Sequence, residues 1–270
     1  RDVERSRGLG DVYKRQNYHL AISIMSDSDL KQLNFPQTIS DSSIKGIILV
    51  EICDKVVCDA LSQFNLPIVS VDMPNVPFEE LNGIDVVTME SKKNLKKIIN
   101  QLIEKGAESF GFVGDLYSPN VSRGFQERYN ALSECLAEHQ LPLNQKNCLL
   151  HQTPEDFRNF QTTVNNLQAM ISLPDVFICG NDWTAIQLIY ALQFLGFQIP
   201  KDICVVGFDN IPAASRISPS LTTISTPQKY LGIAAARQIL ERIQHPNCPH
   251  VFCQYETELI IRNSTNIISF

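Results

Sequence analysis

Two clusters of polar residues between residues 179 and 227 have side chains suited to holding a small hydroxylated molecule. Asn181 and Asp182 end an apolar strand-like run and open a helical pattern, and Asp209 ends the next such run at Gly207-Phe208-Asp209. If both runs are parallel strands, the two clusters lie at carboxyl ends, where open α/β sheets bind ligands. Carboxylates accept two hydrogen bonds, and an arginine that joined them would donate a planar fork, so Asp–Arg–Asn sets can hold a sugar ring.

The other chemically capable residues form no catalytic or metal-binding pattern. The histidines are scattered, and neither a zinc-type His-Glu-x-x-His nor a Ser/His/Asp spacing is visible. No glycine-rich phosphate loop and no Cys-x-x-Cys pair occurs, so we expect no enzyme, no metal and no cofactor. Eight cysteines, several inside apolar runs, are interpreted as reduced core thiols of a cytoplasmic protein; they are Cys53, Cys58, Cys135, Cys148, Cys179, Cys204, Cys248 and Cys253.

The composition is that of a globular protein. The chain has 270 residues, of which 44% are hydrophobic and 19% charged, enough for one large domain or two lobes. Its formal net charge is −6, whereas a DNA-binding domain is expected to have an excess of basic residues. No run of 18 apolar residues and no signal peptide with an apolar centre is visible, so neither a membrane span nor export is expected.

Short apolar runs alternate with helical patterns along the chain, and this alternation predicts parallel sheets covered on both faces by helices. About eight strand–helix units are more than one sheet usually accommodates, so two lobes are favoured. The predicted strands are 18–24, 46–50, 67–72, 84–88, 109–113, 147–150, 175–179 and 203–207. The predicted helices are 55–64, 91–105, 126–139, 155–172, 183–196 and 228–244.

Residues 1–16 differ from the rest of the chain. They hold eight charged residues and two glycines without a sustained apolar period. We interpret them as a non-family leader, tag or scar, with a native disordered terminus as the alternative.

Four ordered motifs resemble those of the LacI/GalR transcription regulators. Residues 181–185 match an "ND-x-x-A" turn, residues 196–209 match "G-x-x-I-P-x-D-I-x-V-V-G-F-D", and residues 219–224 match "P-x-L-T-T-I". Residues 258–265 resemble the closing "E-L-I-x-R-x-S-T". Looser matches are the strand 67–72 and a helix motif that starts at Arg128, in which Ala131 and Cys135 replace glycine and alanine. The resemblance runs from about Tyr18 to Thr265.

The resemblance implies two doubly wound parallel-sheet lobes of the periplasmic-binding-protein-like type I. The N-terminal lobe would take 17–88 and 226–248, and the C-terminal lobe 89–225 and 249–265. The family's first strand and helix, and its DNA-binding headpiece, have no counterpart here. We therefore expect the N-terminal lobe to lack its first strand and helix.

The resemblance also implies an effector site between the lobes. Its residues would be Asp72, Arg128, Asn181 and Asp209, with Trp183 and His151 as further candidates. Each has a structural alternative: a turn for Asp72 and Asp209, a helix cap for Asn181, and a solvated helix position for Arg128. Trp183 could equally serve in lobe packing, and His151 could be an exposed loop residue.

The function that the resemblance implies is an effector-sensing domain of a bacterial repressor. A small sugar or polyol would shift the lobes between two arrangements in a homodimer, and so change the affinity of absent headpieces for operator DNA. The main alternative is an exported sugar-binding protein that serves a transporter, and an enzyme on this fold is a weaker one.

Overall fold

The computed structural model describes residues 18–118, 121–151, 156 and 159–267, and divides them into two compact units. The first unit holds residues 18–89, 121–123 and 227–256. The second unit holds the rest of the described chain, namely 90–118, 124–226 with its gaps, and 257–267. None of the described helices is long and apolar enough to cross a membrane.

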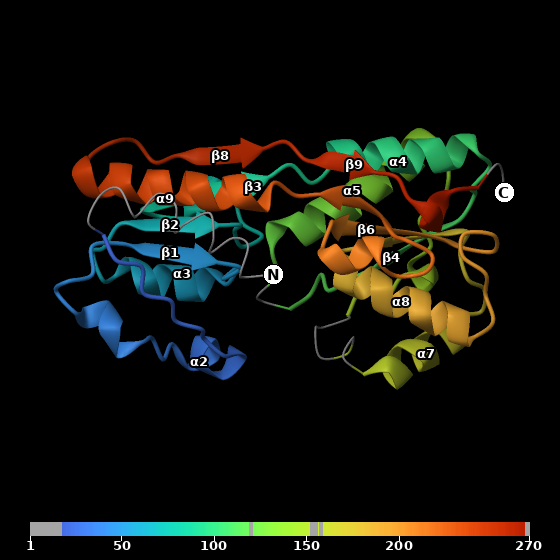
Figure 1. Ribbon diagram of the computed structural model, residues 1–270, viewed down its shortest axis with the longest axis horizontal. Coiled ribbons are helices and arrows are strands. Elements are labelled where there is room, and N and C mark those ends of the chain that lie inside the picture. The colour runs from blue at the N-terminus through green and yellow to red at the C-terminus, as the bar shows by residue number, and fades with distance from the viewer. Residues whose placement is uncertain (1–17, 119–120, 152–155, 157–158, 268–270) are drawn as a thin grey trace. The chain divides into compact units, whose positions relative to one another are not determined.

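The first unit contains a four-stranded parallel sheet in the order β1-β2-β3-β8 (Figure 1). Its strands are β1 Ile47–Val50, β2 Ile68–Val71, β3 Ile84–Met89 and β8 Phe252–Tyr255. Its helices are α2 Asp27–Gln32, α3 Lys55–Ser62 and α9 Gln228–Gln244, with short 3-10 turns at Gln37–Ser40 and Phe78–Glu80. Every residue of β2 and β3 is buried, as expected for strands that carry helices on both faces.

The second unit contains a five-stranded sheet in the order β4-β5-β6-β7-β9, in which only β9 is antiparallel to its neighbour. Its strands are β4 Phe110–Val113, β5 Val176–Cys179, β6 Cys204–Asp209, β7 Thr222–Ser225 and β9 Glu258–Ile260. Its helices are α4 Lys93–Glu104, α5 Arg123–Glu138, α7 Phe160–Gln168 and α8 Asp182–Phe194. Short 3-10 turns lie at Gln145–Asn147, Pro212–Ser215 and Asn263–Thr265.

Buried apolar runs explain the central strands of the second unit. All residues of β4, β5 and β6 are buried, and α8 packs against β5 and β6. Its inner face contributes Ala185, Leu188, Ile189 and Leu192 to the core. Because β4, β5 and β6 are parallel neighbours, their carboxyl ends lie along one edge of the sheet.

Three sequence expectations about the fold need correction. Residues 18–24 form no strand, and the alternating Leu20, Ile22 and Ile24 are exposed, because a strand persists only where a neighbour completes its hydrogen bonds. Residues 147–150 form no strand: a 3-10 turn ends at Asn147, and Leu149 forms a single isolated bridge with Val113 of β4. Residues 249–256 belong to the first unit rather than the second, because β8 pairs with β3. The expected absence of a first strand and helix stays a prediction.

Candidate functional site

Arg128 lies buried on α5, where it reaches the ends of two strands. Its Nη1 donates a hydrogen bond of 2.6 Å to the carbonyl oxygen of Gly180, directly after β5. Its guanidinium lies over the Phe208 ring of β6, 3.5 Å from the ring centroid. A desolvated guanidinium is stabilised over an aromatic face, and its planar fork leaves several donors to use at once. The solvated helix position considered for Arg128 is therefore wrong, because the side chain is only 3% exposed.

Glycine at position 180 lets α5 approach the sheet this closely. A Cβ atom at Gly180 would collide with the Phe125 ring, and one at Gly114 would also press against it. Phe125 lies one helical turn before Arg128, so the two side chains share a face of α5. Gly114 after β4 and Gly180 after β5 thus leave space for the Phe125 ring. Because Phe125 can pack there, Arg128 on the same helix face lies close to the strand ends.

Asp209 is the last residue of β6. It directly follows Phe208, whose ring the Arg128 guanidinium covers. Its side chain is 4% exposed, and its backbone has a φ of 111°, followed by a φ of 53° at Asn210. Two consecutive non-glycine residues at positive φ are costly and persist only where the surroundings hold them. A strained, buried carboxylate at the carboxyl end of a parallel strand is typical of a binding position.

Asn181 is the N-cap of α8, which is the structural alternative to ligand binding that the sequence analysis gave for this residue. Its Oδ1 accepts a hydrogen bond of 2.9 Å from the amide of Thr184. This cap uses only the side-chain oxygen and leaves the NH₂ group as a separate donor. A contact between Asn181 and an effector stays a prediction that is compatible with this cap.

His151 stacks on Tyr117 at the carboxyl end of β4. The ring centroids are 4.2 Å apart and the planes differ by 14°. Asp115 forms an antiparallel bridge with His151, and its Oδ1 accepts a hydrogen bond from the amide of Tyr117, so the two loops are tied together. Tyr117 is 60% exposed. Sequence reasoning missed Tyr117, although a tyrosine just beyond a strand end was a usable signal.

Trp183 lies on the outer side of α8 rather than among the buried polar groups. It is 52% exposed and shares one helix face with Tyr190 and Phe194, seven and eleven residues further on. The predicted effector contact of Trp183 stays a prediction.

Asp72 belongs to the first unit, unlike the other five predicted residues. It follows β2 with a φ of 75°, and its Oδ1 accepts a hydrogen bond of 2.8 Å from the amide of Met73. Asp72 therefore forms the turn that was weighed as its alternative, at the carboxyl edge of the first sheet. Its contact with an effector stays a prediction.

The cysteines near the second sheet are neutral packing groups. Burial raises the pKa of the Cys179 thiol well above its usual value and that of Cys204 to about 12. A thiol with so high a pKa is neither a nucleophile nor a metal ligand at neutral pH. Among the described residues, no group of three or more His, Cys, Asp or Glu side chains could hold a metal ion.

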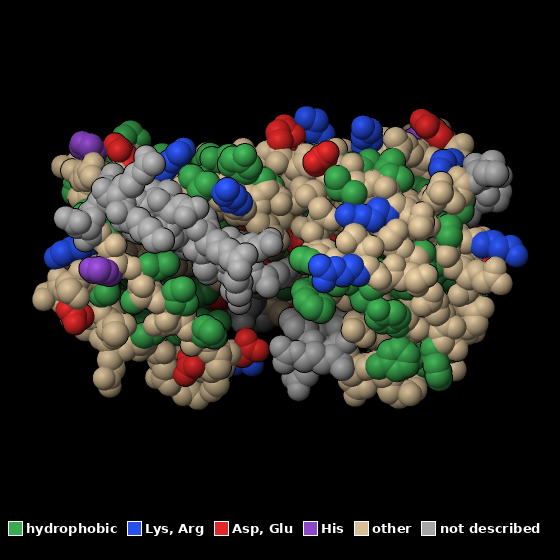
Figure 2. Space-filling model, viewed as in Figure 1, with side chains coloured by type: hydrophobic (Ala, Val, Ile, Leu, Met, Phe, Trp, Pro, Cys, Tyr) green, Lys and Arg blue, Asp and Glu red, His purple; other side chains and the backbone are tan. Residues whose placement is uncertain are grey.

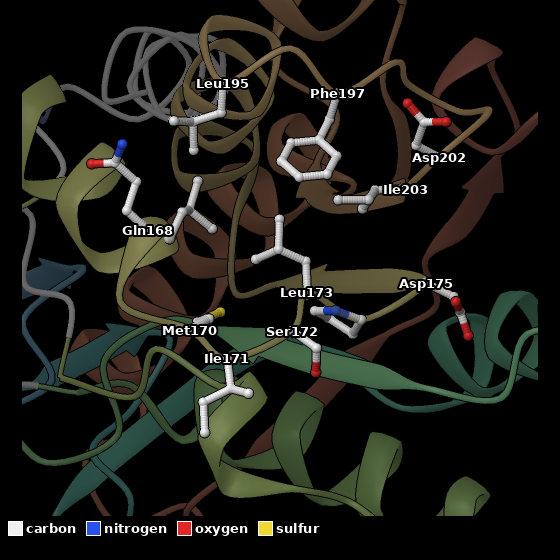
Figure 3. Close-up of a pocket in the computed structure, with 12 residues that line it drawn as sticks. Gln168, Met170, Ile171, Ser172, Leu173, Asp175, Leu195, Phe197, Asp202 and Ile203 are labelled. Carbon is white, nitrogen blue, oxygen red and sulfur yellow. The ribbon is translucent and has the colours of Figure 1, made fainter.

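A cavity of about 420 Å³ lies at the opposite end of the second unit's strands (Figure 3). Its lining comes from the segments that precede β5 and β6, and Figure 3 shows Leu173, Phe197 and Ile203 converging while Asp175 and Asp202 lie to one side. The Asp202 Oδ2 and Asp175 Oδ2 atoms already accept backbone hydrogen bonds. This cavity is separate from the edge that holds Arg128 and Asp209, because its lining precedes β5 and β6 while that edge follows them.

Residues 99–265, more than half of the chain, match the model of the periplasmic binding protein-like domain. The chain belongs to this family. The catabolite control protein A of Staphylococcus xylosus is 28% identical to this domain over 91% of the chain and 74% of the relative. The ribose operon repressor of Haemophilus influenzae is 27% identical over 97% of the chain and 76% of the relative.

A solved structure of a LacI family transcriptional regulator from Enterococcus faecium, with bound ribose, has the same fold as this periplasmic binding protein-like domain. The TM-score is 0.78 at 23% identity, over 97% of this chain and 93% of that one. The alignments with the catabolite control protein and the ribose operon repressor cover most of this chain. The resemblance to LacI/GalR regulators and the predicted α/β fold of the periplasmic-binding-protein-like type I are thereby confirmed, and a regulator is favoured over an exported binding protein or an enzyme.

Proposed function

We propose that this chain is the effector-sensing part of a LacI/GalR-type repressor and that it binds a small neutral sugar or polyol. The observation that carries the proposal is the set at the carboxyl ends of β5 and β6, where buried Arg128 lies over Phe208 and beside the end of β6 that carries Asp209. A guanidinium fork and a carboxylate in one desolvated place suit vicinal hydroxyl groups, each of which donates and accepts. Asn181, His151 and Tyr117 at the same edge, and Asp72 in the first unit, are proposed as further contacts.

The charge around Arg128 favours a neutral ligand. Among the described residues, Asp115, Asp182 and Asp209 are all buried at the carboxyl edge of the second sheet, whereas of the arginines there Arg128 is buried and Arg262 is partly buried. An anionic effector would need excess positive charge to replace its hydration. The described residues of this edge supply the opposite balance, so phosphorylated and carboxylated sugars should be disfavoured.

Ribose is the first ligand to test. One relative is named a ribose operon repressor, and one structural neighbour contains bound ribose. A five-carbon sugar presents neighbouring hydroxyls of the kind that an Asp–Arg pair holds.

The regulatory mechanism that we propose is allosteric. The effector would favour one conformation of a homodimer, and headpieces outside the described residues would bind operator DNA with an affinity that depends on this conformation. Lys and Arg side chains on the face drawn in Figure 2 are scattered. The net charge of −6 supports DNA contact through another segment. All eight cysteines are free thiols, which supports a cytoplasmic location.

Titration calorimetry with ribose and ribose 5-phosphate as a matched pair tests the proposed ligand class. We expect measurable binding of ribose, or of another neutral sugar in a panel, and at least about tenfold weaker binding of its phosphate ester. The variant Asp209→Asn serves as the site control, since it loses the charge and one acceptor at unchanged size. If anionic ligands bind and no neutral sugar binds, the proposed ligand class is wrong.

A further inference from the structure

Asp182, the residue after the cap of α8, is fully buried, and each of its two carboxylate oxygens accepts a hydrogen bond. Its Oδ1 accepts a hydrogen bond of 2.6 Å from the hydroxyl of Thr223 on β7. Its Oδ2 accepts a hydrogen bond of 2.8 Å from the amide of Ile211, two residues after Asp209. The carboxylate also lies in the first turn of α8, where the helix N-terminus stabilises negative charge. Asp182 therefore joins α8, β7 and the loop after β6 through one side chain.

The chain keeps space for this carboxylate at Gly207. A Cβ atom at Gly207 would collide with Asp182 Oδ1 and would also press against Leu221. The glycine two residues before Asp209 is therefore required by the approach of Asp182, and not by the backbone of β6 itself.

The backbone that Asp182 holds is the strained part of the loop. Asp209 and Asn210 both have positive φ, at 111° and 53°. The Ile211 amide is held by Asp182 directly, and the Asn210 amide donates to Thr223 Oγ1 at 3.3 Å, the same hydroxyl that donates to Asp182. Arg262 adds a hydrogen bond of 2.7 Å from Nη2 to Asn210 Oδ1. These contacts hold the two residues that directly follow Asp209.

We propose that Asp182 is a positioning residue of the effector site, whose carboxylate holds residues 209–211 so that Asp209 is aimed at the effector. This inference rests on the proposed function, because it takes Asp209 to contact the sugar. Asp182 itself need not touch the sugar, because its two oxygens are engaged with Thr223 and Ile211.

The first test measures ribose affinity of Asp182→Ala, Asp182→Asn and Asp175→Ala by calorimetry, together with the thermal midpoint of each protein. Removing the carboxylate should weaken binding at least about tenfold. Asparagine should restore affinity to within about threefold, since its Oδ1 can accept from Ile211 while its NH₂ group donates to Thr223 Oγ1. Asp175→Ala is the matched control, because Asp175 caps backbone amides at the opposite edge of the same sheet.

Hydrogen exchange of the ligand-free protein provides a second test that does not depend on the sugar. In Asp182→Ala, the amides of Asn210 and Ile211 should exchange at least about tenfold faster, while those of Val205 and Val206 in β6 keep their protection. If the alanine variant does not fold, Thr223→Val removes only the hydroxyl and should accelerate exchange at Asn210 in the same way.

The two tests separate failure of this proposal from failure of the proposed function. If the wild-type protein binds no neutral sugar but exchange accelerates selectively at 210–211, the function is wrong and the positioning of this loop by Asp182 stands. If the alanine variant binds ribose as the wild type does, or if exchange at 210–211 rises only in step with Val205, the positioning role is overturned. An affinity loss in Asp175→Ala equal to that in Asp182→Ala would overturn it as well.

Discussion

The guanidinium of Arg128 lies 3.5 Å from the centroid of the Phe208 ring while its Nη1 donates to the carbonyl oxygen of Gly180. One side chain on α5 thus contacts the residue after β5 and the residue before the last of β6. The planar fork is needed for this double role, since stacking requires a flat cation and the hydrogen bond requires a directed N–H.

Replacement of Arg128 by lysine should therefore reduce sugar affinity at least about tenfold, although the charge is kept. An ammonium cannot stack on Phe208 and donate a fork to vicinal hydroxyls at once. Calorimetry with ribose measures the loss, and Arg216→Lys on the exposed surface of the same unit is the matched control. Equal affinities in the wild type and Arg128→Lys would remove Arg128 from the site.

Asp209 allows binding and backbone strain to be separated with two substitutions. Glycine adopts a φ of 111° without steric cost, whereas alanine keeps the strain of about 1–3 kcal/mol. We expect both Asp209→Gly and Asp209→Ala to abolish ribose binding. In urea denaturation, we expect the glycine variant to be at least as stable as the alanine variant, despite the greater flexibility of its unfolded chain. A glycine variant that is clearly less stable than the alanine variant would argue against a strained loop.

The sequence predicted the elements whose signals are local. Buried apolar runs predicted β5 and β6, and polar residues directly after them predicted where Asn181 and Asp209 lie. It could not predict contacts between distant segments. Asp182 meets Thr223 across 41 positions, and Tyr117 stacks on His151 only because two loops are tied together at Asp115.

The same limit explains the errors. The alternating Leu20, Ile22 and Ile24 have the pattern of a strand, but their pattern says nothing about whether a partner strand is available. The short β8 and β9, at Phe252–Tyr255 and Glu258–Ile260, were not assigned as strands, because runs of three or four residues with half-exposed positions carry little periodicity.

A buried ion pair stabilises the first unit away from the candidate site. Arg242 on α9 donates from Nε and Nη2 to the two carboxylate oxygens of Asp85 on β3, at 3.0 and 2.7 Å. The same guanidinium donates to the carbonyl oxygens of Pro246, Cys248 and Pro249, which lead into β8. Arg242→Met should therefore lower the free energy of unfolding by about 3–5 kcal/mol at pH 7, because buried Asp85 loses its guanidinium partner and keeps the weaker contacts with Gln238, His250 and Val251. Lys96→Met, which breaks a surface pair with Glu134, is the control and should cost about 1 kcal/mol or less.

The pH dependence of this pair has a definite sign. Burial acts to raise the pKa of Asp85, but hydrogen bonds from Arg242, Gln238 and Val251 outweigh it and hold the pKa below its usual value. The unfolded chain then binds the proton more readily, so the stabilisation is complete above the unfolded pKa of about 3.9 and is lost as pH falls through the folded pKa. The stability difference between wild type and Asp85→Asn, followed by urea denaturation, should shrink as the pH is lowered from about 5 to 3. A difference that stays constant over this range would show that Asp85 does not titrate as argued.

The outer face of α8 leads to the prediction of a dimer surface. The inner face of this helix contributes to the core of the second unit, yet its outer face carries exposed Trp183, Tyr190 and Phe194. A helix that is apolar all round is typically covered on both sides, and aromatic residues are enriched where two proteins meet. We expect the purified chain to form a homodimer through this face.

Tyr190→Glu should then weaken dimerisation at least about tenfold in sedimentation equilibrium, because a charge at the centre of an apolar interface stays unpaired. Tyr230→Glu introduces the same charge on α9 of the first unit, where the tyrosine is 62% exposed, and should leave the dimer intact. A chain that is monomeric at all concentrations, or a dimer that only Tyr230→Glu dissociates, would contradict the assignment of this surface.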